Sequence, residues 1–350
     1  MKRRAGKIFA AAVLVLLTTP WRCPAEDPGT VTLMTHDSFD VSKEVVAAFE
    51  KAHNLRVEFL KSGDAGAALV QAILSKENPM ADVFFGVDNT FLTRALEADI
   101  FEPYESPLLA QIPDALELDP ENRLLPADYG DVCLNYDKKW LARKGMEPPE
   151  SLEDLAKPAY KGLLVVQNPA VSSPGLAFLL ATVGRFGPDG YLDFWKKLRA
   201  NDVLVASGWE DAYYGHFSAA SRGGRPVVVS YASSPAAEVH FAESPPPEAP
   251  TAAVTGNGST FRQIEFVGIL KGAENPEGAR KLVDFMLDTT FQEDIPLRMF
   301  MFPANRSAKL PPVFVEHARK APDSSAAVSP RDIDAHREEW IEAWTATVLR

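Results

Sequence analysis

Ala81–Val87 (ADVFFGV) is the stretch that decides the fold of this chain. From Val83 to Val87 it has no polar side chain, which is typical of a strand buried on both faces of a sheet. Two shorter β-rich runs precede it, at Val31–Thr35 and Arg56–Leu60, and helical patterns follow them at Val41–Lys51 and Ala67–Lys76. This βαβαβ order predicts a parallel sheet with right-handed crossovers.

A second α/β series begins near Tyr129. Its expected strands are Val132–Tyr136, Leu163–Val166, Val203–Ala206, Val227–Ser230 and Glu265–Leu270. Its expected helices are Gly190–Arg199, Trp209–Ala220 and Pro276–Asp288. This alternation predicts an α/β fold of two lobes, each a largely parallel sheet flanked by helices.

The chain is expected to cross between the lobes more than once, near Pro126–Tyr129, Gln263 and Pro303. The first lobe is predicted to comprise residues 30–126 plus 264–302, and the second lobe residues 127–263 plus 303–350. Ligands bind at the carboxyl ends of parallel strands. The candidates after the first three strands are therefore His36, Asp37 and Ser38, then Lys61–Asp64, then Asp88 and Asn89. Asn89 or Thr90 is also expected to cap the next helix.

Residues 1–25 have the pattern of a secretory signal peptide. A basic start precedes the apolar run Ile8–Thr18, which is too short to span a bilayer, and Ala25 fits a cleavage position. We therefore expect export to the periplasm. Cleavage would remove five positive charges and change the net charge from −12 to −17. That balance argues against nucleic acid or an anionic membrane as a partner. Cys133 would be the remaining cysteine, and we expect it to be buried.

Asn168–Leu180 (NPAVSSPGLAFLL) is the most informative candidate for a ligand site. Ser172 and Ser173 precede an apolar helical segment, Pro174 fits its first turn, and Gly175 would let a ligand approach the backbone. Free N–H groups at such a helix start favour anions and polar oxygens. The alternative is an ordinary capped helix without a ligand.

Other strand ends carry small hydroxyl and aromatic side chains. Ser207-Gly208-Trp209 and Ser230–Pro235 each follow a strand and open a helix, and Asp64 follows a strand of the first lobe. Trp209 is alternatively a core residue and Asp64 a helix cap. No hydrolase, nucleotide-binding or zinc motif occurs in the sequence, and the six histidines lack metal-ligand spacing. We therefore predict a binding protein without cofactor, metal site or catalytic residues, not an enzyme.

The chain as a whole resembles the periplasmic thiamine-binding proteins that serve ABC importers. The resemblance follows the whole chain in order: Thr35–Phe39, Ala81–Asn89, Asp128–Gly130, Tyr136–Lys138, Asn168–Leu180, Gly208–Tyr213, Val229–Pro235, Phe285–Pro296 and Arg337–Trp344. It implies a two-lobed, flytrap-like periplasmic-binding-protein fold that closes on thiamine or a thiamine phosphate. It also implies an ABC permease in the membrane as partner. We expect a monomer.

The resemblance further implies roles for particular residues. Asp64 and the Ala65 backbone would meet the ligand from the first lobe, and Ser172 and Ser173 would take its hydroxyl or phosphate end. Trp209 would pack on the ring system. An aromatic wall and further donors would come from Tyr231, Ala232, Ser233 and Ser234. Additional candidates are His36, Asp37 and Phe300.

The chain departs from the family at several aromatic positions. His36 stands where the family has a tyrosine, Phe300 lies near an expected tryptophan, and Ala237 lies near another expected aromatic residue. A tryptophan expected after the first strand is absent, and Asp40–Ser42 occupies that region. These departures affect ring stacking and hence the identity of the ligand.

Three alternative functions remain. A ferric-ion binder of the same fold would use paired tyrosines, but Tyr213 and Tyr214 are expected to point apart on a helix. An organophosphate or polyamine binder would keep the fold and change the ligand. An exported enzyme acting on thiamine or a phosphate ester belongs to a different class, and no evident nucleophile supports it.

Overall fold

The computed structural model describes residues 29–321 and 328–350. The predicted signal peptide, residues 1–25, lies outside the described residues. Within the described part, no helix is long and apolar enough to cross a membrane.

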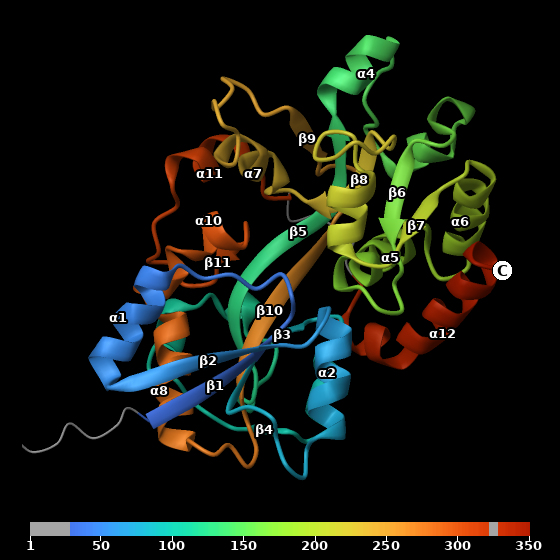
Figure 1. The fold of residues 1–350 in the computed structure, drawn as a ribbon. Coiled ribbons are helices and arrows are strands. Elements are labelled where there is room, and N and C mark those ends of the chain that lie inside the picture. The colour runs from blue at the N-terminus through green and yellow to red at the C-terminus, as the bar shows by residue number, and fades with distance from the viewer. Residues whose placement is uncertain (1–28, 322–327) are drawn as a thin grey trace, which may run out of the picture.

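An eleven-stranded sheet runs through the molecule in the order β2-β1-β3-β10-β5-β8-β6-β7 (Figure 1). One end of the sheet is the parallel triplet β1 (Gly29–Thr35), β2 (Leu55–Lys61) and β3 (Val83–Asp88). The other end is the parallel triplet β6 (Leu164–Gln167), β7 (Leu204–Ala206) and β8 (Val227–Tyr231). The predicted mixed α/β fold with parallel strands and flanking helices is confirmed.

Two long antiparallel strands, β5 (Leu125–Asp137) and β10 (Phe261–Leu270), join the two triplets. The sequence predicts only the second half of β5 and of β10. Three short strands pair off the main path: β4 (Phe101–Glu102) with β10, and β9 (Thr251–Val254) and β11 (Phe302–Pro303) with β5.

The predicted crossing points lie side by side in these strands. Tyr129 in β5 pairs with Ile264 in β10 and with Phe302 in β11, and Gly130 pairs with Gln263. The chain therefore passes three times through the middle of the sheet at one level. The division of the chain into two lobes with the boundaries given above stays a prediction.

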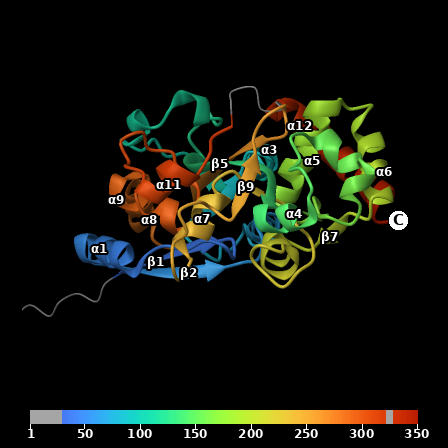
Figure 2. The ribbon, with the colours of Figure 1, turned by 90° about the horizontal axis from the view of Figure 1, so that it is seen from above.

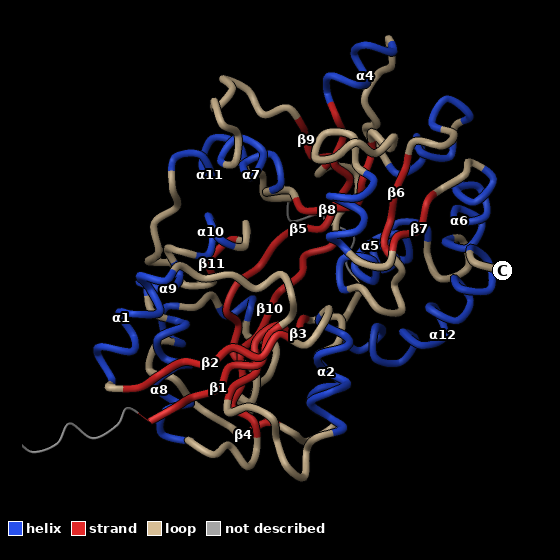
Figure 3. The backbone as a smooth tube through the Cα atoms, in the orientation of Figure 1, coloured by secondary structure: helices blue, strands red, loops and turns tan. Residues whose placement is uncertain are grey.

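Helices cover the sheet on both sides (Figure 3), and α1 and α6 lie at opposite ends of the molecule in both ribbon views (Figures 1 and 2). The helices that follow the first strands are α1 (Lys43–His53), α2 (Ala65–Leu74) and α3 (Leu92–Glu97). Those of the middle of the chain are α4 (Lys138–Lys144), α5 (Ser173–Phe186), α6 (Tyr191–Ala200) and α7 (Ser234–His240). The last ones are α8 (Pro276–Leu287), α9 (Thr289–Gln292), α10 (Ile295–Arg298), α11 (Pro312–His317) and α12 (Pro330–Val348).

Helix α5 is the central helix of the largest core cluster, and its residues from Ser173 to Val183 are all buried. The helix α12 packs on α6 beside it, where the rings of Trp195 and Trp344 meet edge to face at 5.4 Å. The Trp195 Nε1–H donates to Thr182 Oγ1 at 3.0 Å, which satisfies a buried indole donor. This packing fixes the position of α5 and thereby of its first turn.

Two local predictions are wrong. The helix expected over 209–220 starts where expected but ends at His216, and its Asp211–His216 part is a π-helix. Neither Asn89 nor Thr90 caps α3, whose N-cap position is Phe91. Both the N–H and the hydroxyl of Thr90 instead donate to Asp88, so the buried carboxylate takes these donors.

Candidate functional site

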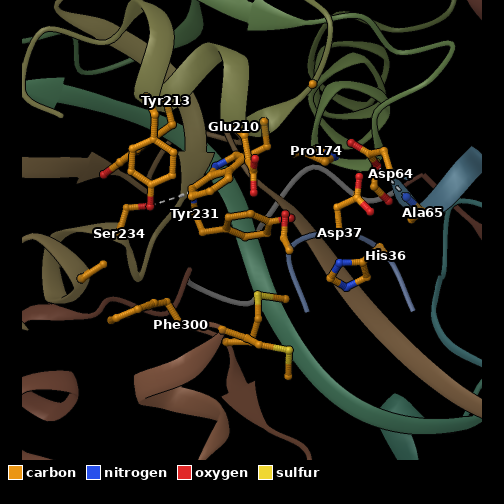
Figure 4. Close-up of a pocket in the computed structure, with 18 of the residues that line it drawn as sticks. His36, Asp37, Asp64, Ala65, Pro174, Glu210, Tyr213, Tyr231, Ser234 and Phe300 are labelled. Carbon is orange, nitrogen blue, oxygen red and sulfur yellow. Dashed lines mark hydrogen bonds between the residues drawn. The ribbon is translucent and has the colours of Figure 1, made fainter. Parts of the chain in front are cut away.

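A cleft of about 830 Å³ opens between the ends of β1 and β2 and the segment from Trp209 to α7 (Figure 4). Ten of the twelve predicted site residues line it: His36, Asp37, Asp64, Ala65, Ser173, Trp209, Tyr231, Ser233, Ser234 and Phe300. They come from segments that are far apart in the sequence. The expectation that the residues after several strands gather at one place is therefore confirmed, and Phe300, which does not follow a strand, joins them.

The strand-end candidates Lys61, Ser62, Gly63, Asp88 and Asn89 do not line the cleft, and of the twelve residues above neither do Ser172 and Ala232. Both are completely buried behind its wall. The N–H of Ala232 donates to the carbonyl of Asp131 at 2.9 Å, and the Ala232 carbonyl accepts from Arg319. The Ser172 hydroxyl has no hydrogen-bond partner among the described residues. Both residues are buried next to residues that line the cleft, Ser172 beside Ser173 and Ala232 beside Tyr231.

The start of α5 faces carboxylates of the chain itself. The Ser173 hydroxyl donates to the Asp88 carboxylate, and the Ser173 N–H bonds to the Asp64 carboxylate. Asp64 caps α2 as the sequence suggests, because its carboxylate accepts from the Ala65 N–H at 2.7 Å. The same side chain therefore serves as a helix cap and as part of the cleft wall.

Gly175 has a different role from the one expected. It does not line the cleft, and a Cβ atom there would lie 2.8 Å from the carbonyl oxygen of Gln167. The residue is small because the end of β6 passes against it. The prediction that Gly175 lets a ligand approach the backbone is wrong for this reason.

Three aromatic rings form one wall of the cleft, and we call Trp209, Tyr213 and Tyr214 the aromatic cluster. The Trp209 ring stacks on Tyr213 at 4.9 Å and meets Tyr214 edge-on at 5.4 Å. The two tyrosine rings lie 5.5 Å apart, so the expectation that they point apart is wrong. Both tyrosine rings contact Trp209: Tyr213 stacks on it, and Tyr214, five positions further along, meets its edge beside the π-helix.

Hydrogen bonds hold the aromatic cluster in place. The Trp209 Nε1–H donates to Ser230 Oγ at 2.9 Å, and the Tyr213 hydroxyl donates to Glu238 Oε1 at 2.6 Å. Burial raises the pKa of the Glu238 carboxyl. Burial and the nearby Glu238 charge raise the pKa of the Tyr213 hydroxyl well above its usual value, so Tyr213 stays protonated and donates.

Glu265 lines the cleft and forms one group with two buried carboxylates, Asp88 and Asp128, that do not line it; we call the three carboxylates and His36 the floor. Glu265 in β10 pairs in register with Asp88 in β3 and with Asp128 in β5. Nε2 of His36 lies 3.3 Å from Glu265 Oε1. Burial alone would lower the pKa of His36, but the Glu265 charge raises it overall. Burial likewise opposes ionisation of Glu265, but the positive His36 lowers its pKa overall.

The other two floor carboxylates favour their protonated forms. Burial and the Glu265 charge raise the pKa of Asp128 well above its ordinary value. Burial raises the pKa of Asp88 to about 7, against the lowering effect of the hydrogen bonds from Thr90. The floor therefore combines one His36–Glu265 ion pair with two carboxyl groups that readily hold protons.

Tyr231 and Phe300 complete the cleft near its middle and its mouth (Figure 4). The Tyr231 hydroxyl donates to Gln263 Oε1 at 3.1 Å, and burial raises the Tyr231 pKa well above its usual value. Phe300 adopts a left-handed backbone with a φ of 56°, and its ring lies 5.3 Å from that of Phe241. A left-handed backbone is uncommon for a bulky residue, so Phe300 lines the cleft in a strained conformation.

Sequence reasoning missed several residues of the cleft, namely Tyr213, Tyr214, Glu210, Glu238, Phe241, Gln263, Glu265, Arg298 and Met301. Glu265 offers the one signal that was available, since a lone acidic residue within an apolar strand is unusual unless paired. Its partner His36 lies more than two hundred positions away, so the pair is visible only in the fold. Across the described residues, no group of three or more His, Cys, Asp or Glu side chains is arranged to hold a metal ion.

Comparison with known proteins gives consistent matches. Residues 78–327 match the family described as bacterial extracellular solute-binding protein. The thiamine-binding periplasmic protein of Brucella suis is 32% identical, over 93% of this chain and 94% of that protein. That of Salmonella typhimurium is 30% identical, over 93% of this chain and 96% of that protein. A solved structure described as a periplasmic thiamin binding protein superposes with a TM-score of 0.81 at 28% identity, covering 93% of this chain and 98% of the other.

Proposed function

The chain belongs to the bacterial extracellular solute-binding proteins and, within them, to the thiamine-binding periplasmic group; from this membership we propose that it captures thiamine or a thiamine phosphate. The observation that carries the proposal is the cleft, in which the aromatic cluster faces the Asp64 carboxylate. Thiamine joins two flat rings, and one of them is a cation. Aromatic faces and a carboxylate are the groups that recognise such a ligand.

We propose the following contacts. Trp209 and Tyr231 pack on the rings of the ligand. Asp64 accepts a hydrogen bond from the aminopyrimidine or balances the positive thiazolium. Ser233 and Ser234 offer hydroxyl groups at the opposite wall. His36, Asp37 and Phe300 border the same space.

The mechanism follows from a ligand that touches both sides of the cleft. A ligand that contacts both walls only in the closed arrangement shifts the population toward closure. Ser173 already bridges the two sides through Asp64 and Asp88. We propose that the closed form then docks on the permease of an ABC importer in the membrane.

The remaining properties follow from this role. The protein is periplasmic, and we propose that residues 1–25 are the signal peptide that exports it. We propose that it acts as a monomer and returns its ligand chemically unchanged, since binding and release are the whole task. No step of this mechanism requires a cofactor.

Calorimetric titration of the purified protein with thiamine and its phosphates tests the proposal. We expect at least one of them to bind far more tightly than millimolar, and mass spectrometry to recover it intact. Failure of all three to bind tighter than millimolar would exclude thiamine as the ligand. Ferric citrate is the control for the iron alternative, because a visible tyrosinate–iron band would support that reading instead.

A further inference from the structure

We infer that His36 is a specificity-determining residue of the cleft: as an imidazolium it donates a hydrogen bond from Nδ1 to a ring nitrogen of the ligand's aminopyrimidine and keeps the thiazolium away. This inference rests on the proposed function and deepens it, because it states which ring of thiamine lies at the end of β1. It follows from the packing around His36, from its pairing with Glu265 and from the charges on the rest of the lining.

The His36 ring packs against β3 at the end of β1. Gly86 in β3 has a φ of 106°, and a Cβ atom there would lie 2.4 Å from His36 Cδ2. The imidazole therefore occupies space that a glycine at position 86 leaves open. On the same strand, the Phe85 ring lies 5.7 Å from the imidazole. These contacts limit the rotation of the imidazole.

Glu265 determines the charge of His36. The Nε2 atom of His36 is buried and lies 3.3 Å from Glu265 Oε1. Burial and the charge of Lys61 lower the pKa of His36, but the charges of Glu265 and Asp64 raise it overall. His36 is therefore an imidazolium, in which both ring nitrogens carry a proton.

The second ring nitrogen of His36, Nδ1, is available to a ligand. His36 lines the cleft, and of its two ring nitrogens only Nε2 is a buried atom without a hydrogen bond. Within residues 29–321 and 328–350, no hydrogen bond is formed with Nδ1. The imidazolium thus offers one N–H at the cleft. A ligand that covers this N–H must supply an acceptor, because a buried donor without a partner is costly.

The rest of the lining has the opposite charge. His36 and Arg298 are the basic side chains of the described lining, and Arg298 Nη2 lies 2.9 Å from Asp40 Oδ2. Three lining carboxylates form no ion pair among the described residues: Asp64, Glu210 and Glu238. A cationic group of the ligand is therefore attracted to these carboxylates and repelled by His36.

Thiamine has two ends that match this distribution. Its aminopyrimidine is neutral at pH 7, and the ring nitrogens accept hydrogen bonds. Its thiazolium is positively charged and offers no acceptor nitrogen. The aminopyrimidine therefore lies beside His36, where a charged donor meets a ring nitrogen. The thiazolium lies farther from the end of β1, among the carboxylates.

A mutant cycle that changes both the protein and the ligand tests the inference. The ligands are thiamine and two analogues, in each of which a C–H group replaces one of the two pyrimidine ring nitrogens. We expect one analogue to bind the wild type at least tenfold more weakly than thiamine does, as for a lost charge-assisted hydrogen bond. His36→Phe should reduce this difference below threefold, and His36→Gln, which keeps an N–H donor, should retain more of it.

His336→Phe is the matched control. His336 Nδ1 lies 3.3 Å from Glu339 Oε2 in α12, outside the cleft, so this variant also removes a histidine that pairs with a glutamate. It should keep the tenfold difference. Equal binding of thiamine and both analogues by the wild type would overturn the inference and leave the proposed function standing. An unchanged difference in folded His36→Phe would also overturn the inference. Absence of thiamine binding by the wild type would overturn both.

Nitrogen-15 NMR of the wild-type protein tests the same contact without a substitution beside Glu265. We expect thiamine to shift the Nδ1 signal of His36 while Nδ1 stays protonated. The weakly bound analogue, at saturating concentration, should leave the signal close to its position without ligand. The His336 signals are the internal control and should not move. Equal shifts of the His36 Nδ1 signal by thiamine and by both analogues would overturn the inference.

Discussion

The Ser173 hydroxyl at the start of α5 donates a hydrogen bond to the Asp88 carboxylate at the end of β3. These two residues lie 85 positions apart. Asp88 ends β3 of one parallel triplet, and Ser173 starts the helix that follows β6 of the other triplet. The Ser173 N–H bonds to Asp64 at the start of α2 as well. One serine therefore connects the two sides of the cleft, directly beside the proposed ligand.

Asp88 makes stability depend on pH. Burial raises its pKa to about 7 from 3.8, so the folded state holds this proton more tightly than the unfolded chain. The group therefore contributes stability at low pH that is lost as the pH rises from about 4 to about 7, on the order of 4 kcal/mol in full. Asp88→Asn removes this dependence, because an amide does not titrate. The variant keeps its hydrogen bonds, since its Oδ1 accepts from Thr90 and its Nδ2–H donates to Ser173.

Urea denaturation at pH 5 and pH 8.5 measures the effect. We expect the free energy of unfolding of Asp88→Asn, relative to the wild type, to be higher at pH 8.5 than at pH 5. A difference that does not change with pH would contradict the raised pKa of Asp88.

Asp64→Ala is expected to lower the affinity for thiamine at least tenfold and to leave the fold intact. It also removes the cap of α2, at a cost of about 1 kcal/mol in stability. Asp64→Asn separates the two roles, since asparagine keeps an acceptor for the Ala65 N–H and removes the charge. We expect the asparagine variant to lose affinity and keep its melting temperature.

Calorimetry measures the affinity for thiamine, and thermal unfolding measures the melting temperature. Asp288→Asn is the matched control, because Asp288 caps α9 outside the cleft. Its affinity should equal that of the wild type. Wild-type affinity in both Asp64 variants would show that Asp64 does not meet the ligand.

Trp209→Ala is likewise expected to lower the affinity for thiamine at least tenfold. The substitution removes the face on which a ring packs and leaves Tyr213 without its stacking partner. Stacking contributes about 0.5–1.5 kcal/mol per aromatic pair beyond burial. Trp209→Phe retains a ring and should lose less. Trp140→Ala in α4, outside the cleft, should bind as the wild type does, and equal losses at 140 and 209 would refute a direct role.

Gly175→Ala is expected to destabilise the protein by about 1–3 kcal/mol, because its Cβ would meet the Gln167 carbonyl at 2.8 Å. The main chain of β6 cannot move aside without disturbing the sheet. Gly256→Ala is the control, since no atom lies within 4 Å of the corresponding Cβ. Chemical denaturation should show a loss only at position 175. Equal stability of the two variants would mean that β6 yields to the added methyl group.

Much of the architecture was predictable from local patterns. The first three strands and the helices α1 and α2 lie within a few residues of their expected positions, because their periodicity is strong and their capping residues are standard. The strands β5 and β10 are longer than predicted. Their first halves carry polar residues such as Asp128 and Gln263, which look like loop residues until strands on both sides cover them.

The cleft was predictable in part. Strand-end position alone indicated Asp64, Trp209 and Tyr231, because parallel strands of a sheet present their carboxyl ends at one edge. The proximity of Tyr213 to Tyr214 was not predictable, since a π-helix leaves no clear signature in a single sequence. The sequence likewise gave no reason to exclude Ser172 from the lining while Ser173 belongs to it.

By itself, the sequence determined the α/β class, the order of the elements and the strand ends from which a ligand site is built. These properties depend on residues close together in the chain. Only the tertiary structure decided that Ser173 meets Asp88, that His36 pairs with Glu265, and that carboxylates occupy the starts of α2 and α5. Pairing, burial and pKa depend on neighbours that are distant in the chain, and folding alone brings those neighbours within reach of each other.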